Sequence, residues 1–215
     1  MLVQDRMSTP AVTVEPDLPF QEALKLMQQH RFRRLPVVDR RQRLVGIVSE
    51  RDLLHAAPSP ATSLNIWELN YLLSKLTVGE LMTRQVHVVT PDTPIEEAAR
   101  LMVAHKIGGL PVVDQARHVL GVITETDIFK VFSEMLGSDV PGLRLVLAMP
   151  PGQMPLAALL QALVELDGRL VSVGTFRPDE QGHARVLIKV AGIPKEALLA
   201  RLEALGDHVL DVREV

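Results

Sequence analysis

Leu35-Pro36-Val37-Val38-Asp39, followed by Gly46-Ile47-Val48-Ser49-Glu50-Arg51-Asp52, is a pattern that occurs twice in this chain. The second copy is Leu110-Pro111-Val112-Val113-Asp114 with Gly121-Val122-Ile123-Thr124-Glu125-Thr126-Asp127, and adding 75 to a residue number carries the first copy onto the second without a gap. A repeat of this length is typical of one supersecondary unit that buries its apolar face against its copy. A pseudo-twofold pair has two related clefts between its halves, and we expect the function there.

Each copy is predicted to fold in the order β-α-β-β-α. Alternating valines in residues 12–14 predict a short strand, and apolar positions at helical spacing in residues 23–27 predict a helix. The continuous apolar runs 35–38 and 44–48 are typical of buried strands. In the second copy, Thr93-Pro94-Ile95-Glu96 fits a capping box with proline at the first helical position, which predicts where that helix begins.

We place the first repeat at residues 1–57 and the second at residues 78–137, with residues 58–77 as a linker. The linker begins with a proline-rich stretch and continues into a predicted insert helix, which holds the only Trp and Tyr of the chain, Trp67 and Tyr71. Two aromatic residues one helical turn apart could contact a cofactor or a partner. They are more often part of a core or a dimer contact, and we favour that interpretation.

Residues 140–215 are predicted to form a third module, because the repeat pattern ends before Gly142. Alternating leucines predict strands and leucines at helical spacing predict helices, in the order β-α-β-β-α-β. This order is the split βαβ, ferredoxin-like arrangement, in which two helices cover one face of an antiparallel sheet. The whole chain is therefore assigned to the α+β class, with two β-α-β-β-α repeats packed as a pseudo-twofold pair and followed by this module.

The composition is that of a folded globular protein, with 47% hydrophobic residues, 26 acidic and 23 basic side chains and no cysteine. The small negative net charge gives no general attraction to polyanions, so we expect no nucleic-acid partner. The lack of cysteine excludes disulfides and favours a reducing compartment. Residues 1–6 carry no leader pattern and no apolar run approaches the length of a membrane span, so we expect a cytoplasmic protein with no membrane partner.

No motif in the sequence argues for catalysis. The chain has no Gly-x-Ser-x-Gly motif, no phosphate-loop lysine motif and no GxGxxG run. Its seven histidines show no spacing typical of metal ligands. We therefore predict that the protein is not an enzyme, has no catalytic residues, binds no metal and requires no cofactor.

Asp52 and Asp127 stand at equivalent strand-to-helix turns, and Ser49 and Thr124 precede them by three residues. An ionised carboxylate accepts hydrogen bonds through two oxygens, which matches the two donors of a ribose diol. A hydroxyl at the start of a helix suits a phosphate or ribose oxygen. The same spacing also fits a helix cap that needs no ligand, so the spacing alone leaves both interpretations open.

Arg33 and Arg34 enter a buried strand, where phosphate is the natural bidentate partner of a guanidinium. Gly108 and Gly109 occupy the equivalent positions of the second copy, and glycine allows close approach of a ligand but supplies no charge. We therefore expect the arginine pair to serve one cleft, and the two clefts to differ in phosphate preference or occupancy. A solvated edge beside Arg31 is the alternative interpretation of the two arginines.

Residues 1–133 resemble a tandem pair of CBS domains, the Bateman module, through the Pro-Val-Val-Asp strands, the Gly-h-h-Ser/Thr-x-x-Asp turns (h, apolar) and the repeat offset. Residues 142–215 resemble an ACT domain. The combination, together with the insert helix, is similar to the acetoin-utilisation protein B group. The resemblance implies that an adenosine-containing effector such as AMP, ADP, ATP, S-adenosylmethionine or NADH binds in clefts shared by both repeats.

The resemblance also implies which residues form each cleft. The first cleft would use Met7, Val12, Phe32, Arg33 and Arg34 of one repeat with Val122, Thr124 and Asp127 of the other. The second cleft would use Met82, His87, Ile107, Gly108 and Gly109 with Ile47, Ser49 and Asp52.

The ACT-like module departs from the pattern of its family at one position. Pro151-Gly152 is present, but Met149 stands where an amino-acid site typically carries an acidic residue. The amine of an amino acid would lose its expected partner there. We therefore expect this module to serve dimerisation through the sheet edge rather than effector binding.

The resemblance as a whole implies a regulatory protein that signals through rearrangement of its repeats to the ACT-like module or to a partner. We expect a homodimer and a regulated enzyme as partners. Two alternatives remain open. One is a purely structural or oligomerisation module without a ligand, and the other is a regulatory subunit of an enzyme of acetoin or acetyl-CoA metabolism.

Overall fold

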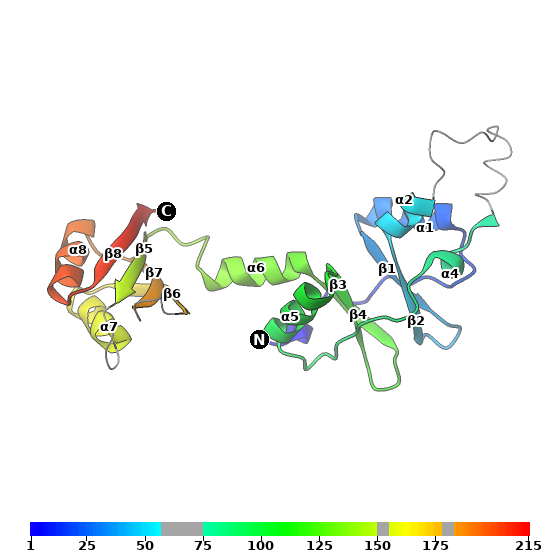
Figure 1. The fold of residues 1–215 in the computed structure, drawn as a ribbon, viewed down its shortest axis with the longest axis horizontal. Helices are drawn as coiled ribbons and strands as arrows, with labels where there is room; N and C mark the ends of the chain where they lie inside the picture. The colour runs from blue at the N-terminus through cyan, green and yellow to red at the C-terminus, as the bar shows by residue number, and fades with distance from the viewer. Residues whose placement is uncertain (57–74, 150–154, 178–182) are drawn as a thin grey trace. The chain divides into compact units, whose positions relative to one another are not determined.

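The computed structural model describes residues 1–56, 75–149, 155–177 and 183–215. It divides into two compact units, Met1–Ile128 and Phe129–Val215, whose elements are labelled in Figure 1. The predicted insert helix with Trp67 and Tyr71 lies outside the described residues. No helix in the described ranges is long and apolar enough to cross a membrane.

The first unit contains the two repeats, and their helices and strands begin at positions 75 residues apart. This confirms the repeat that the sequence predicts. The first repeat consists of η1 (Val3–Asp5), α1 (Phe20–His30), β1 (Arg34–Val38), β2 (Leu44–Ser49) and α2 (Glu50–Ala56). The second consists of α4 (Val78–Leu81), α5 (Ile95–His105), β3 (Gly109–Val113), β4 (Val119–Thr124) and α6 (Glu125–Met135), and α6 continues beyond Ile128 into the second unit.

Each repeat is built around one antiparallel hairpin, β1–β2 or β3–β4. The predicted first strand of each copy is shorter than expected. It is reduced to one parallel bridge, Val14 to Val37 in the first repeat and Val89 to Val112 in the second. Pro16 has no N–H to donate and follows Val14 closely, which limits the pairing of this segment.

The helix that follows also begins differently from the prediction. Pro94 occupies the N-cap position of α5 rather than the first helical position, and no side chain caps the helix there. The Thr93 hydroxyl instead accepts a hydrogen bond from the backbone N–H of Thr90, at 3.1 Å. The predicted capping box was therefore wrong, although the helix itself is confirmed.

Isolated bridges show that the two repeats pack as a pseudo-twofold pair. Ser8 pairs with Val122 and Thr83 pairs with Ile47, and the 75-residue offset exchanges these two bridges. Arg43 and His118 are equivalent residues of the two repeats, so the repeat symmetry maps the bridge between them onto itself. The segment before each hairpin therefore crosses to pair with the hairpin of the other repeat.

Equivalent apolar residues form the core of each repeat. Leu35 and Leu110 are fully buried on the first strand of each hairpin, and Met27 and Met102 are buried on the helices that pack against them. Burial of one such side chain contributes about 1.5–3 kcal/mol. The apolar runs that define the repeat in the sequence are thus the buried strands of the structure.

The second unit contains a four-stranded sheet in the order β6-β7-β5-β8, in which every neighbouring pair is antiparallel. Leu145, Leu159 and Leu198 belong to one core cluster, so both helices cover the same face of the sheet. The predicted β-α-β-β-α-β order is confirmed, while membership of the ACT family stays a prediction. The elements are β5 (Leu143–Met149), α7 (Pro155–Glu165), β6 (Arg169–Phe176), β7 (Ala184–Ala191), α8 (Lys195–Ala204) and β8 (His208–Glu214).

Two side chains of this sheet bind the backbone carbonyls that follow helix α6. The ammonium group of Lys189, which is 3% exposed, donates a hydrogen bond to the carbonyl of Gly137 at 2.9 Å. The Ser172 hydroxyl donates one to the carbonyl of Leu136 at 3.1 Å. A cation is favourable at the C-terminus of a helix, where the carbonyls carry partial negative charge. These contacts fix the end of α6 to β6 and β7.

Replacing Lys189 by methionine is expected to lower the free energy of unfolding of the second unit by about 1 kcal/mol, because the Gly137 carbonyl loses its donor. Calorimetric melting of the full chain measures the effect. Arg185→Met is the matched control, since Arg185 is exposed on the same strand. Equal melting curves for the two variants would contradict a stabilising role for this hydrogen bond.

Candidate functional site

The crossing segments build two cavities between the repeats. Ser8 and Val122 exchange backbone hydrogen bonds of 2.9 and 3.1 Å, and Ile47 and Thr83 exchange equivalent bonds of 3.0 and 2.9 Å. Each exchange holds the entry segment of one repeat beside the second hairpin strand of the other. The cavities on either side are therefore lined by both repeats.

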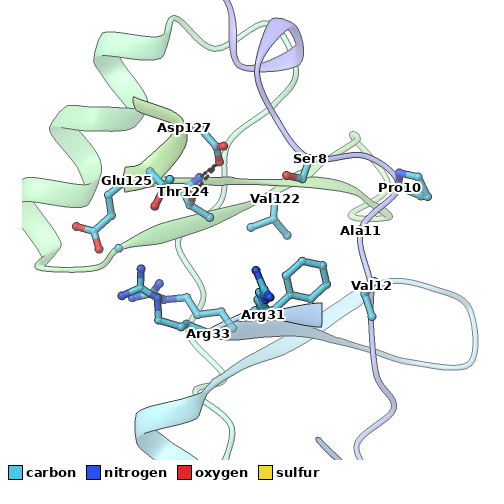
Figure 2. A pocket seen from close by; sticks show the side chains of 14 residues that line it. Ser8, Pro10, Ala11, Val12, Arg31, Arg33, Val122, Thr124, Glu125 and Asp127 are labelled. Atoms are coloured by element: carbon cyan, nitrogen blue, oxygen red, sulfur yellow. Dashed lines mark hydrogen bonds between the residues drawn. The ribbon is translucent and has the colours of Figure 1, made fainter. Parts of the chain in front are cut away.

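The smaller cavity has a volume of about 240 Å³. Figure 2 shows Arg31 and Arg33 on one side of it, facing Val122 and Thr124 on the other. Seven of the eight residues predicted for the first cleft line it, and Met7 is the exception. Its lining is Ser8, Pro10, Ala11, Val12, Arg31, Phe32, Arg33, Arg34, Gly108, Val122, Thr124, Glu125, Thr126 and Asp127.

The larger cavity has a volume of about 550 Å³, which lies within the usual range for small-molecule sites of roughly 300–1,000 Å³. Six of the eight residues predicted for the second cleft line it, and Met82 and Gly108 are the exceptions. Its lining is Arg33, Arg34, Ile47, Ser49, Glu50, Arg51, Asp52, Thr83, Gln85, Val86, His87, His105, Lys106, Ile107 and Gly109.

The two methionines lie against strand glycines and line neither of these two cavities. Met7 packs against Gly121, and Met82 packs against Gly46, where an added Cβ atom would collide with the methionine sulfur. The glycines leave room for these side chains, so the methionines join the packing between the repeats. Gly108 lines the smaller cavity rather than the larger one. The structure thus does not support the predicted placement of these three residues.

Asp127 and Asp52 line opposite cavities and have the same local geometry. The Oδ2 atom of Asp127 accepts hydrogen bonds from the backbone N–H and the hydroxyl of Thr124, at 2.9 and 2.7 Å. Asp52 accepts the same pair from Ser49, at 2.9 and 2.7 Å. These bonds join each carboxylate to the strand-to-helix turn before α6 or α2. The capping interpretation is therefore confirmed, and only one oxygen of each carboxylate makes these bonds.

Arg33 and Arg34 line both cavities, so the expectation that they serve one cleft was wrong. The reason lies in the glycine of the other repeat. A Cβ atom on Gly108 would lie 2.7 Å from Nη2 of Arg34, so the missing side chain leaves room for this guanidinium. The arginine pair therefore reaches both sides of the pseudo-twofold axis.

Arg34 lies in a mixed electrostatic environment. Partial burial lowers the pKa of its guanidinium from the ordinary value, and the nearby charge of Arg33 acts in the same direction. The carboxylates of Glu125 and Asp52 oppose this change of the pKa. Glu125 lines the smaller cavity and Asp52 the larger one, so Arg34 interacts with a carboxylate of each.

Sequence reasoning missed several basic residues of the cavities. Arg31 lines the smaller cavity and Lys106 the larger one, and the repeat offset makes them equivalent. Each residue follows the C-terminus of a helix and has a left-handed backbone conformation, with φ of 57° for Arg31 and 53° for Lys106. In the larger cavity His105 stacks on His87 with 3.7 Å between the ring centroids. The repeat itself was the signal that could have identified Arg31 and Lys106 as a pair.

Residues 3–59 and 78–134 match the family model described as "CBS domain". A CBS domain-containing protein of Dictyostelium discoideum is 32% identical over 136 residues, which cover 63% of this chain and 94% of that protein. The L-aspartate semialdehyde sulfurtransferase of Methanocaldococcus jannaschii is 34% identical over 131 residues, which cover 61% of this chain. The chain spans only 23% of the length of that enzyme.

Solved structures are similar over the same share of the chain. The CBS domain pair of protein MJ0100, in complex with 5′-methylthioadenosine and S-adenosyl-L-methionine, is 32% identical and covers 65% of this chain and 98% of its own, with a TM-score of 0.53. A Vibrio cholerae protein described as an acetoin utilization protein is also 32% identical, over 65% and 95%, with a TM-score of 0.53. CBSX2 in complex with AMP is 34% identical, over 61% and 95%, with a TM-score of 0.50.

Proposed function

The chain belongs to the CBS domain family, as a tandem pair of CBS domains, and on that basis we propose that it is a regulatory protein that binds an adenosine-containing ligand between its repeats. One observation carries the proposal. The smaller cavity combines the capped turn of Thr124 and Asp127 with arginines of the other repeat, and the larger one combines the capped turn of Ser49 and Asp52 with Lys106 of the other repeat and the two shared arginines. This arrangement suits a ribose at one end of a ligand and a phosphate at the other.

The remaining oxygen of Asp127 would accept from the ribose diol, with the Thr124 hydroxyl beside it. Val12 and Val122 supply apolar surface for an adenine ring in the smaller cavity, and Ile47 and Ile107 supply it in the larger one. Phosphate groups would bind the guanidinium groups of the shared arginines. The proposed site also includes the other predicted residues that line the cavities, and it leaves out Met7 and Met82; these further residues are Phe32, Ser49, Asp52, His87, Gly108 and Gly109.

The relatives support adenosine chemistry for the ligand. The MJ0100 pair was solved with 5′-methylthioadenosine and S-adenosyl-L-methionine, and CBSX2 with AMP. AMP, ADP, ATP, S-adenosylmethionine and NADH therefore remain our candidate effectors. No catalytic residue, metal or obligatory cofactor is part of the proposal.

We propose that ligand binding acts on the relative arrangement of the repeats, and that the ACT-like module or a partner reads the change. A ligand transmits a signal only when it favours one arrangement over the other. Asp127 lies in the first turn of α6, and the carbonyls after this helix bind Lys189 and Ser172. A homodimer and a cytoplasmic location belong to the same proposal.

Two further functions compete with this proposal. The similarity to the Vibrio cholerae acetoin utilization protein favours a regulatory subunit of an enzyme of acetoin or acetyl-CoA metabolism. The capping hydrogen bonds of Asp52 and Asp127 favour a structural module in which the carboxylates serve the helices alone. A binding experiment separates the structural alternative from the others.

The experiment is a thermal-melt panel on the full chain with the five candidate effectors and 5′-methylthioadenosine. A ligand at about 100 times its Kd adds about 2.7 kcal/mol to the stability of the native state, which raises Tm by several degrees in a chain of this size. We expect at least one candidate to do so. Lack of any rise at millimolar concentration would favour the structural alternative.

A further inference from the structure

The two repeats differ at the positions that bring cations to the cavities. Arg31 and Lys106 are equivalent, and each lines only the cavity of its own side. Arg33 and Arg34 have glycines as their equivalents and line both cavities. Each cavity therefore has one basic residue of its own at this equivalent position, the larger one has Arg51 in addition, and the same two arginines are common to both.

The surroundings of Arg34 explain how one side chain reaches two sites. On the hairpin, Arg34 is paired with Ser49, which lines the larger cavity. Its guanidinium extends over Gly108, where an added Cβ atom would also collide with the carboxylate of Glu125 in the smaller cavity. Arg34 thus lies between groups of the two cavities.

We propose that Arg33 and Arg34 form one phosphate-binding group that serves both cavities, so that a phosphorylated adenosine ligand in one cavity disfavours a second one in the other. This inference rests on the proposed function. A guanidinium holds its N–H donors in a rigid plane, so an arginine side chain oriented toward a phosphate in one cavity is turned away from the best geometry for a phosphate in the other. Two phosphates at the same arginine pair also repel each other.

A ligand without phosphate does not use this group and is not subject to the same restriction. One phosphorylated ligand and one phosphate-free adenosine ligand can then occupy the two cavities together. The chain would respond to the balance between these two ligand classes, and not only to the concentration of one of them.

The test compares the two sites alone and together, by isothermal titration calorimetry of the full chain. Val122 and Ile47 are equivalent residues, and each lines one cavity only. Val122→Trp is designed to fill the smaller cavity and Ile47→Trp the larger one. Each variant then reports the affinity of the site that remains, with AMP and 5′-methylthioadenosine as probes.

In the unmodified chain, the second AMP is expected to bind at least tenfold more weakly than the two blocked variants predict for independent sites. The two sites for 5′-methylthioadenosine are expected to bind independently, so that the isotherm of the unmodified chain equals the sum of those of the two blocked variants. In the chain carrying both Arg33→Ala and Arg34→Ala, AMP is expected to bind more weakly. Its two sites are then expected to bind independently of each other. An AMP isotherm of the unmodified chain that equals the sum of the blocked variants would overturn the inference.

Single substitutions keep the test decisive if a tryptophan variant does not fold. Arg31→Ala and Lys106→Ala are expected to weaken one AMP binding step each, whereas Arg34→Ala is expected to weaken both. An Arg34→Ala effect confined to one step would contradict the sharing. Failure of AMP and of 5′-methylthioadenosine to bind the unmodified chain at all would contradict the proposed function as well.

Discussion

Replacing Asp127 by asparagine is expected to weaken binding of adenosine-containing ligands to the smaller cavity by about 10- to 100-fold, as for loss of charge-assisted hydrogen bonds worth about 1.5–3 kcal/mol. Asparagine keeps one carbonyl oxygen, which can still accept the two hydrogen bonds from Thr124 that cap α6. Its other group is an NH₂ donor, which cannot accept from a ribose hydroxyl. The substitution therefore separates the ligand role from the capping role.

Isothermal titration calorimetry measures the affinity, and thermal melting without ligand measures the cap. Asp127→Ala is the matched comparison, because it removes both roles and is expected to lower stability by about 1 kcal/mol more than Asp127→Asn. Asp52→Asn is the second control, since this residue lines the larger cavity. If Asp127→Asn bound ligand as tightly as the unmodified chain, the carboxylate would be a cap and no more.

Replacing Gly121 by alanine is expected to lower the free energy of unfolding by about 2–3 kcal/mol, as for an overpacked core position. A Cβ atom there would lie 2.7 Å from the backbone carbonyl oxygen of Ser8. Ser8 is held by two backbone hydrogen bonds to Val122, so the carbonyl cannot move without breaking the crossing between the repeats. Because Ser8 also lines the smaller cavity, ligand binding there is expected to weaken too.

Gly46→Ala is the matched control, since Gly46 is the equivalent residue of the first repeat. Its added Cβ atom would meet mainly the side chain of Met82, which can adopt another rotamer, and we expect a loss below about 1.5 kcal/mol. Both variants lose the same chain entropy in the unfolded state, so that term cancels in the comparison. Calorimetric melting of the two proteins checks the order. A larger loss for Gly46→Ala would contradict the role given to the Ser8 carbonyl.

Much of the fold could be predicted because the sequence contains the same structural pattern twice. The apolar runs around Leu35 and Leu110 became equivalent buried strands, and the pattern of residues 140–215 became the expected β-α-β-β-α-β order. Two copies of one pattern support each other, since a chance periodicity is not repeated at a fixed offset. The first strand was overestimated because the pairing of Val14 is limited by a nearby proline, whose effect the alternating valines did not show.

The sites were predicted in part, and the errors share one cause. Sequence spacing identified Thr124 and Asp127 together because they lie on one continuous turn. It could not show that Arg34 reaches the second cavity, because this depends on space over Gly108 in the other repeat. Met7 was misplaced for the same reason, since the glycine that receives it is distant in the sequence. Contacts between residues that are close in the sequence can be predicted from the sequence alone. Contacts across the pseudo-twofold axis can be identified only once the three-dimensional structure is known.

A crystal structure of the full chain grown with AMP would show whether the cavities between the repeats bind an adenosine-containing ligand. We expect AMP in at least one cavity, with its ribose hydroxyls bound to the carboxylate of Asp127 or Asp52 and its phosphate bound to Arg33 or Arg34. AMP bound elsewhere on the chain, with neither carboxylate in contact with a ribose, would mean that these cavities are not the adenosine site.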